Sequence, residues 1–227
     1  MLSSRPFKKL QSKRIYSIEG NIGAGKTTIL KLIGSTIDDV MFVEEPVSQW
    51  QNLGGMNLLE KFYEDPDRWG FSFEFYVMLS KLKALAKAAE SDKEIIILER
   101  SLFSNKIFMD ISSKLGKLND LEYHMLMTTF NFYVENVYPL LSGIIYLRTT
   151  VNECIRRIAK RNRGEEVSVD KNYLTMLQDK FDEFSNASSI PTLVINGNYD
   201  IERDSSKIAI DIDKFMHPSR SSSVILE

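Results

Sequence analysis

The chain has 227 residues with 43% hydrophobic side chains, which suits one α/β domain with a sizeable core. Its net charge of −2 provides no basic field that would favour a nucleic-acid partner. The single cysteine, Cys154, excludes an intrachain disulfide and a cysteine-only zinc site and favours a reducing compartment. No apolar segment approaches the roughly 18 residues of a membrane-spanning helix, so we expect no membrane partner.

The N-terminal stretch MLSSRPFKKLQSKR carries five basic residues and no acidic one. We expect residues 1–13 to form a flexible, solvated tail, residues 14–216 to form a single domain, and residues 217–227 to form a second flexible tail. A mitochondrial presequence has a similar composition and is the alternative for the first segment. The expected compartment is therefore the cytoplasm, with the mitochondrion as the alternative.

Short apolar runs alternate with helical patterns along the rest of the chain. The runs EIIILE and GIIYLR are almost continuously apolar, as in parallel strands that are buried on both faces. The predicted strands are 14–19, 40–43, 94–98, 143–148 and 192–195, and the predicted helices are 26–36, 56–63, 67–90, 101–115, 119–138, 151–162, 170–186 and 204–216. This order predicts a three-layer α/β sandwich in which a five-stranded parallel sheet carries helices on both faces.

The stretch SIEGNIGAGKTTILKLI, residues 17–33, joins the first predicted strand to the first predicted helix through a glycine-rich loop. Its GxxxxGK[ST] pattern predicts a phosphate-binding loop in which Lys26 reaches the outer phosphates and the hydroxyl of Thr27 holds Mg²⁺. A chance match is the alternative, and it should arise in roughly 1% of chains of this length. The strand and helix around the loop favour a P-loop NTPase-like fold. The expected ATP-binding residues of the loop are Gly20, Asn21, Ile22, Gly23, Ala24, Gly25, Lys26, Thr27 and Thr28.

A second feature is the basic segment 156–163, which contains five lysines and arginines. The residues alone leave three interpretations open: a solvated helix face, a patch that binds RNA, or a lid that closes over a triphosphate.

Three further stretches, EEPVSQW at 44–50, FYEDPDRWGFSFEFYVMLSK at 62–81 and LERSLFSN at 98–105, resemble the deoxynucleoside kinase family. With the phosphate loop and RNRGEE at 161–166, the resemblance extends from about residue 13 to residue 216. It implies transfer of the γ-phosphoryl group of ATP, or of another nucleoside triphosphate, to the 5′-hydroxyl of a deoxynucleoside, with Mg²⁺ as cofactor. It also implies a lid at about 157–168 and a homodimer, for which the apolar segment 123–138 is a candidate interface helix.

The resemblance assigns the catalytic roles. Glu45 matches the carboxylate that accepts the proton of the 5′-hydroxyl, and the following proline restricts its backbone toward extended geometry. Glu99 matches the residue that holds Mg²⁺ together with Thr27, and it is the fallback candidate for the base. Arg100 matches the residue that orients Glu45 and the 5′-oxygen. Lys26 is the fourth expected catalytic residue.

The remaining site residues also follow from the resemblance. Arg157, Arg161 and Arg163 match the arginines of the lid, and Asn198 and Tyr199 fall where a loop packs on the nucleobase of ATP. On the acceptor side, Tyr63 and Glu166 match contacts of the sugar 3′-hydroxyl, and Trp50, Phe73 and Phe108 match the apolar walls of the nucleoside pocket.

The positions that read the base depart from the family pattern. Glu74 stands in place of a glutamine, Lys81 in place of an arginine and Asn105 in place of an aspartate. An ionised Glu74 offers acceptors only, so it should favour guanine, which presents two donors, and then thymine, which presents one. Pairing of Glu74 with Lys81, seven residues along the same helix face, is the alternative. Broad specificity or a preference for pyrimidines is the corresponding alternative for the substrate.

Three other functions compete. A GTPase switch is disfavoured because the chain lacks the Asn-Lys-x-Asp motif that reads guanine. A nucleoside monophosphate kinase would need further cations for its acceptor phosphate, which Glu45 would repel. A non-catalytic member of the fold could lose catalytic residues at little cost, yet Lys26, Thr27, Glu45, Glu99 and Arg100 are all present.

Overall fold

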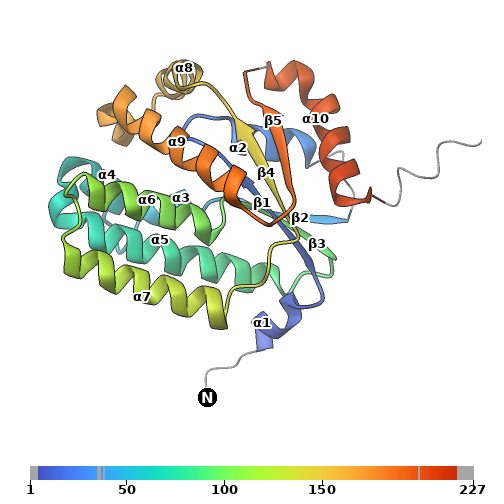
Figure 1. Ribbon diagram of the computed structural model, residues 1–227, viewed down its shortest axis with the longest axis horizontal. Coiled ribbons are helices and arrows are strands. Elements are labelled where there is room, and N and C mark those ends of the chain that lie inside the picture. The colour runs from blue at the N-terminus through green and yellow to red at the C-terminus, as the bar shows by residue number, and fades with distance from the viewer. Residues whose placement is uncertain (1–4, 35–36, 38, 199, 219–227) are drawn as a thin grey trace, which may run out of the picture.

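The computed structural model describes residues 5–34, 37, 39–198 and 200–218. Figure 1 shows an open sheet with helices on both faces. The sheet has five strands in the order β2-β3-β1-β4-β5, and all paired strands are parallel. The strands are β1 Arg14–Glu19, β2 Val40–Val43, β3 Ile95–Glu99, β4 Gly143–Arg148 and β5 Thr192–Asn196. The predicted α/β class and its P-loop NTPase-like sheet are therefore confirmed.

The register of the sheet places the functional segments at one edge. β1 lies at the centre, where Ile18 is opposite Glu99 of β3 and Ile145 of β4. Every residue of β3 is buried, which explains the continuous apolar run in its sequence. Because parallel strands end at the same edge, the segments that follow β1, β2 and β3 meet there.

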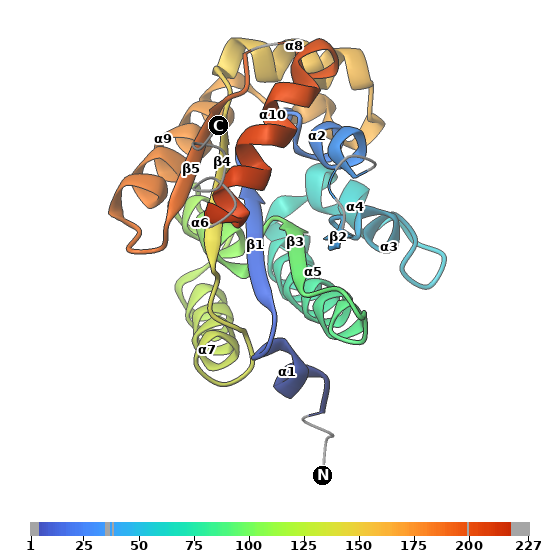
Figure 2. The same ribbon diagram turned by 90° about the vertical axis from the view of Figure 1, so that its right-hand side faces the viewer.

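The helices form two layers (Figures 1 and 2). α2 and α10 pack against each other on one face, whereas α5, α6 and α9 cover the other face and α7 packs on the outer side of α5 and α6. The helices are α1 Arg5–Leu10, α2 Lys26–Ile33, α3 Val47–Gln51, α4 Leu58–Glu64, α5 Pro66–Ala88, α6 Leu102–Lys114, α7 Asp120–Asn136, α8 Val151–Arg161, α9 Lys171–Ala187 and α10 Ile201–Met216, with a 3₁₀-helix at Gly164–Ser168. None of the helices in the described ranges combines the length and apolar character that crossing a bilayer requires.

Two expectations about local structure need correction. The segment predicted as a tail at 1–13 contains helix α1, whose Leu10 is 1% exposed in the core. The Lys13 ammonium then donates to the carbonyls of Ser91 and Lys93, at 2.8 and 2.6 Å, and ties this segment to the chain after α5. Helix α3 is a second difference, because residues 47–51 are not among the predicted helices. Both helices have fewer than seven residues, too few for a helical period to show.

Candidate active site

The phosphate loop between β1 and α2 has the backbone that its glycines allow. Gly20 and Gly23 have φ angles of 147° and 75°, and a Cβ atom on Gly23 would lie 2.6 Å from the Cys154 carbonyl oxygen. Lys26 begins α2, and its Nζ donates to the carbonyl oxygens of Gly20 at 3.1 Å and Asn21 at 2.8 Å. The ammonium is therefore folded back over the loop.

Burial of Lys26 is the main cause that lowers its pKa to about 7, and the charge of Arg100 lowers it further. A bound anion would stabilise the charged form of this lysine, because its attraction offsets the free-energy cost of burying the ammonium away from water. The following helix directs its N–H groups to the same point. The loop thus has the backbone geometry and the charge that would suit phosphate oxygens.

Glu45 lies beside the loop and is held by two cations from different elements. Arg100, directly after β3, donates from Nη1 to Glu45 at 2.8 Å, and the Nζ of Lys81 on α5 lies 3.3 Å from the other carboxylate oxygen. Burial alone would raise the pKa of Glu45, but the charges of Arg100 and Lys81 outweigh it and lower this pKa to about 2. Glu45 is consequently ionised throughout the neutral range.

Glu99 and Thr27 bring two oxygen groups together at the edge of the sheet. The Thr27 hydroxyl donates to Glu99 Oε1 at 2.5 Å, while Glu99 Oε2 accepts from the backbone N–H of Glu45 at 3.4 Å. Mg²⁺ prefers oxygen ligands and usually takes one or two protein groups, with the rest supplied by phosphates and water. The pair fits that requirement. Across the described ranges, no three His, Cys, Asp or Glu residues converge as a metal site of their own.

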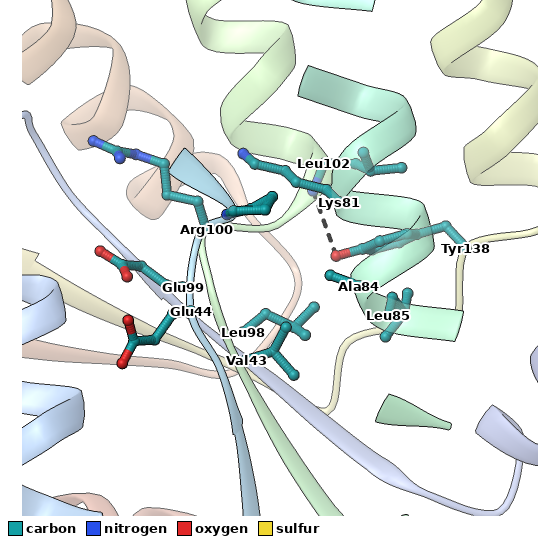
Figure 3. A pocket seen from close by; sticks show the side chains of 11 residues that line it. Val43, Glu44, Lys81, Ala84, Leu85, Leu98, Glu99, Arg100, Leu102 and Tyr138 are labelled. Carbon is teal, nitrogen blue, oxygen red and sulfur yellow. Dashed lines mark hydrogen bonds between the residues drawn. The ribbon is translucent and has the colours of Figure 1, made fainter. Parts of the chain in front are cut away.

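Figure 3 shows a small cavity beside these groups. Glu99 and Arg100 lie next to each other at the end of β3, and Lys81 reaches toward them from α5. Tyr138 lies across the cavity and accepts a hydrogen bond from the backbone N–H of Leu102 at 3.4 Å.

The three positions that depart from the family pattern meet in the interior. Glu74 on α5 is 3% exposed and hydrogen-bonds to Asn105 of α6. The Lys81 ammonium donates to Asn105 Oδ1 at 3.0 Å and approaches Glu45, and no ion pair joins it to Glu74 in the described part of the chain. Lys81 thus forms its ion pair with Glu45 and not with Glu74, although its charge still acts to lower the pKa of Glu74.

The predicted apolar walls fall in two places. Trp50 and Phe73 share one cluster, with their rings edge to face at 5.7 Å, and the indole N–H donates to Ser80 at 2.8 Å. Phe108 lies apart from them, with the Arg100 guanidinium 5.3 Å from its ring centre. Arg100 thus stands between the phosphate side and one aromatic wall.

The basic segment 156–163 covers the second half of α8 and the turn before the 3₁₀-helix, and two of its arginines pair with a residue of that 3₁₀-helix. Arg161 and Arg163 both contact the buried carboxylate of Glu166, the latter at 2.9 Å. Burial raises the pKa of Tyr63, and the Glu166 charge adds to this rise. Tyr63, Glu166 and two of the predicted lid arginines therefore form one group.

Arg157 joins the same helix to the phosphate loop. Its guanidinium donates to the carbonyl oxygens of Ala24 at 2.6 Å and Gly197 at 2.8 Å. Asn198 accepts from the backbone N–H and the hydroxyl of Thr150, at 3.0 and 2.9 Å, and so fixes the loop after β5 to the start of α8. Tyr199, the other residue predicted there, lies outside the described residues.

Sequence reasoning missed three contacts of the site. Lys81 was expected near the base and not on Glu45. Glu19 at the end of β1 binds the segment after Arg100. The only feature of the sequence that could have indicated this role is its position as a charged residue at the end of a strand, which Glu99 shares. Glu165 of the 3₁₀-helix accepts from the amides of Gln51 and Asn57, at 2.8 and 2.9 Å. This last contact ties the 3₁₀-helix to the end of α3 and to Asn57, the N-cap residue of α4.

Comparison with known proteins adds to this geometry. The family model described as deoxynucleoside kinase matches residues 16–217. The "Probable deoxycytidine kinase" of fowlpox virus is 35% identical, over 87% of this chain and 85% of its own length. Deoxycytidine kinase 2 of Gallus gallus is 32% identical over 88% of each chain. Mitochondrial thymidine kinase 2 of Homo sapiens is 32% identical over 92% of this chain and 80% of its own.

Proposed function

The chain belongs to the deoxynucleoside kinase family, and from that premise we propose that it transfers the γ-phosphoryl group of ATP, or of another nucleoside triphosphate, to the 5′-hydroxyl of a deoxynucleoside in nucleotide salvage. One observation supports this most strongly. A phosphate loop with a buried Lys26 lies beside an ionised Glu45 that is held by two cations.

In the proposed reaction the 5′-oxygen attacks the γ-phosphorus, and the bond from this phosphorus to the bridging oxygen of ADP breaks. The proton of the hydroxyl passes to Glu45, which is ionised and ready to accept it. Arg100 fixes the direction of this carboxylate through its bond at 2.8 Å. Charge spreads over the transferring group, so positioned cations contribute most of the rate acceleration.

The cations proposed for this purpose are Lys26 and the lid residues Arg161 and Arg163. Both arginines contact Glu166 in this structure, so they must exchange that partner for phosphate oxygens. Glu166 is then available for the sugar 3′-hydroxyl, together with Tyr63. Thr27 and Glu99 would hold Mg²⁺, which supplies positive charge to the phosphates when bound.

The activity is tested with purified protein, ATP, Mg²⁺ and each of the four deoxynucleosides. We expect the 5′-monophosphate as product. Deoxynucleoside monophosphates should not serve as acceptors, because Glu45 would repel their phosphate, and ATP should not be hydrolysed rapidly without an acceptor. Absence of transfer to all four deoxynucleosides would refute the proposal, and transfer to a monophosphate would favour the monophosphate kinase alternative.

The base preference that we propose depends on the protonation of Glu74. Burial is the main cause that raises the pKa of this carboxyl group to about 8, although Lys81 and the hydrogen bond to Asn105 oppose the rise. Above that pH Glu74 is ionised, offers only acceptors, and favours deoxyguanosine and then thymidine. Below it the neutral acid offers one donor and one acceptor, as a glutamine amide does, and broad specificity follows.

Prediction for Glu74: the ratio of kcat/KM for deoxyguanosine to that for deoxycytidine should rise between about pH 6.5 and about pH 9, as the donor on Glu74 is lost. One buried hydrogen-bond mismatch is worth about 1–3 kcal/mol, so the full change is roughly 5–150-fold. In Glu74→Gln this ratio should not vary with pH. Compared with the ionised wild type, the variant should use deoxycytidine or deoxyadenosine better relative to deoxyguanosine. An equal pH dependence in both enzymes would exclude Glu74 as the base reader.

We also propose a homodimer formed through α7 and the adjoining face of α5. Leu121, Met125 and Phe132 of α7 and Phe75 of α5 are exposed apolar side chains. Light scattering at micromolar concentration should therefore give twice the mass of the 26.1 kDa chain. Phe132→Glu should shift the mass toward that of one chain, because a charge would be buried in the interface. A wild-type mass near that of a single chain would contradict the proposal.

For the compartment we propose the cytoplasm, with the mitochondrion as the alternative. The human relative is mitochondrial by its name, and the single cysteine suits either reducing compartment. Fractionation of cells that express the chain would decide between them.

A further inference from the structure

The backbone of Arg100 is in a conformation that few residues adopt. Its φ angle is 59°, in the left-handed region, although it is not a glycine. It connects β3 directly to Ser101, the N-cap residue of α6. Such a conformation costs on the order of 1–3 kcal/mol and persists only where the surrounding contacts enforce it.

The side chain of Arg100 depends on this turn. Its Nη1 donates to Glu45 at 2.8 Å, and its Nη2 donates to the carbonyl oxygen of Gly20 at 3.1 Å. Its Nε is buried and has no hydrogen-bond partner in the described part of the chain. The hydrogen bonds of the guanidinium therefore all lie at its far end, and the place from which the side chain starts is set by the backbone.

Glu19 supplies the contact on the far side of this turn. It is the last residue of β1 and is 1% exposed. One carboxylate oxygen accepts from the backbone N–H of Ser101 at 2.9 Å, and the other accepts from the hydroxyl of Ser104. On the near side, the N–H of Arg100 donates to the Ile18 carbonyl oxygen at 3.0 Å. Two consecutive residues of β1 thus hold the two peptide N–H groups that flank Arg100.

We propose that Glu19 is a positioning residue for phosphoryl transfer: its carboxylate fixes the turn at Arg100 and Ser101 and so places the Arg100 guanidinium on Glu45. This inference rests on the proposed function, in which Arg100 orients the base. Glu19 reaches the reacting atoms only through Arg100. A hydrogen bond to a carboxylate is about twice as strong as one between neutral groups, so the charge of Glu19 matters to the strength of the clamp.

The test uses two substitutions that weaken the bond to Ser101 in different ways. Glu19→Gln keeps the shape and removes the charge, whereas Glu19→Asp keeps the charge and withdraws the carboxylate by one methylene. Each should lower kcat by roughly 10-fold, which corresponds to about 1.4 kcal/mol of transition-state free energy. KM for ATP and for the deoxynucleoside should stay within about 3-fold, because the Glu19 carboxylate contacts Ser101 and Ser104, neither of which is proposed to bind a substrate.

Ser104→Ala is the matched control. It removes the second hydrogen bond to Glu19 and leaves the bond to Ser101 in place, so kcat should stay within about 3-fold of wild type. A loss of kcat as large as that in Glu19→Gln would show that the buried network as a whole matters, and it would overturn the specific role of the Ser101 contact.

Coupling to Arg100 separates positioning from general stability. In an Arg100→Ala background, Glu19→Gln should change kcat by less than about 3-fold, because the group that it positions is gone. An equal effect in both backgrounds overturns the inference, and so does failure of both Glu19 variants to fold.

The same substitutions distinguish failure of the proposed role of Glu19 from failure of the proposed role of Arg100. If Arg100→Ala lowers kcat and the two Glu19 substitutions do not, only the role of Glu19 is refuted. If Arg100→Ala itself leaves kcat unchanged, the proposed role of Arg100 fails, and the inference about Glu19 fails with it.

Discussion

Replacement of Lys26 by alanine should reduce kcat by at least roughly 10³-fold, the largest loss that we expect from a single substitution. The Lys26 ammonium lies at the mouth of the phosphate loop, within 3.1 Å of two loop carbonyl oxygens. It is almost completely buried, so neither water nor a neighbouring side chain can replace it against the charge that develops on the transferring group. Steady-state kinetics with the best deoxynucleoside measure the effect.

Lys31→Ala is the matched control, because Lys31 is on the same helix, is largely exposed and lies 3.8 Å from Glu44. Its activity should equal that of wild type.

A second readout follows from the pKa of Lys26, which is about 7 before a triphosphate binds. Bound phosphates raise this pKa, so ATP binding above pH 7 should take up a proton, and Lys26→Ala should lose that uptake. Near-normal turnover of Lys26→Ala would refute the phosphate-loop assignment.

The parts of the fold that the sequence predicted are those with a local cause. The central strands β1, β3 and β4 are short and largely buried, and the phosphate loop is a contiguous pattern whose glycines are needed for its own backbone. The end of β3 was misplaced by one residue, because Glu99 is charged and yet belongs to the strand. Thr27, which donates a hydrogen bond to Glu99, lies 72 residues away in the chain. The two side chains meet because β1 and β3 are parallel neighbours that end at the same edge of the sheet.

The parts of the site that the sequence did not predict depend on how far side chains reach in three dimensions. Lys81 and Glu74 lie on the same helix at a spacing that suggests a pair, but the lysine instead contacts Glu45, which follows a different strand. The protonation of Glu74 depends on its burial, which a sequence does not contain. The contact from Glu19 to Ser101 crosses 82 residues of chain and requires an unusual turn at Arg100.

Replacement of Glu45 by glutamine should lower kcat by roughly 10²–10⁴-fold with little change in the affinity for the deoxynucleoside. The amide keeps the size of the side chain and one acceptor oxygen, but it cannot take the proton of the 5′-hydroxyl. Glu45 also balances Arg100 and Lys81, so a neutral residue there leaves two buried cations without their carboxylate partner. Thermal unfolding should be measured alongside turnover to separate this structural effect from the chemical one.

The neighbouring Glu44 provides the control, because its side chain is about half exposed and its only described ion pair is the one at 3.8 Å to Lys31. Glu44→Gln should retain wild-type kcat. In the wild type, the lowered pKa of Glu45 keeps this carboxylate ionised from pH 9 down to well below pH 5, so its titration should not limit turnover in that range. If Glu45→Gln turned over within a few-fold of wild type, the base would have to be Glu99, whose carboxylate already contacts the backbone N–H of Glu45. The matching substitution Glu99→Gln, assayed at saturating Mg²⁺, would then have to show the 10²–10⁴-fold loss instead.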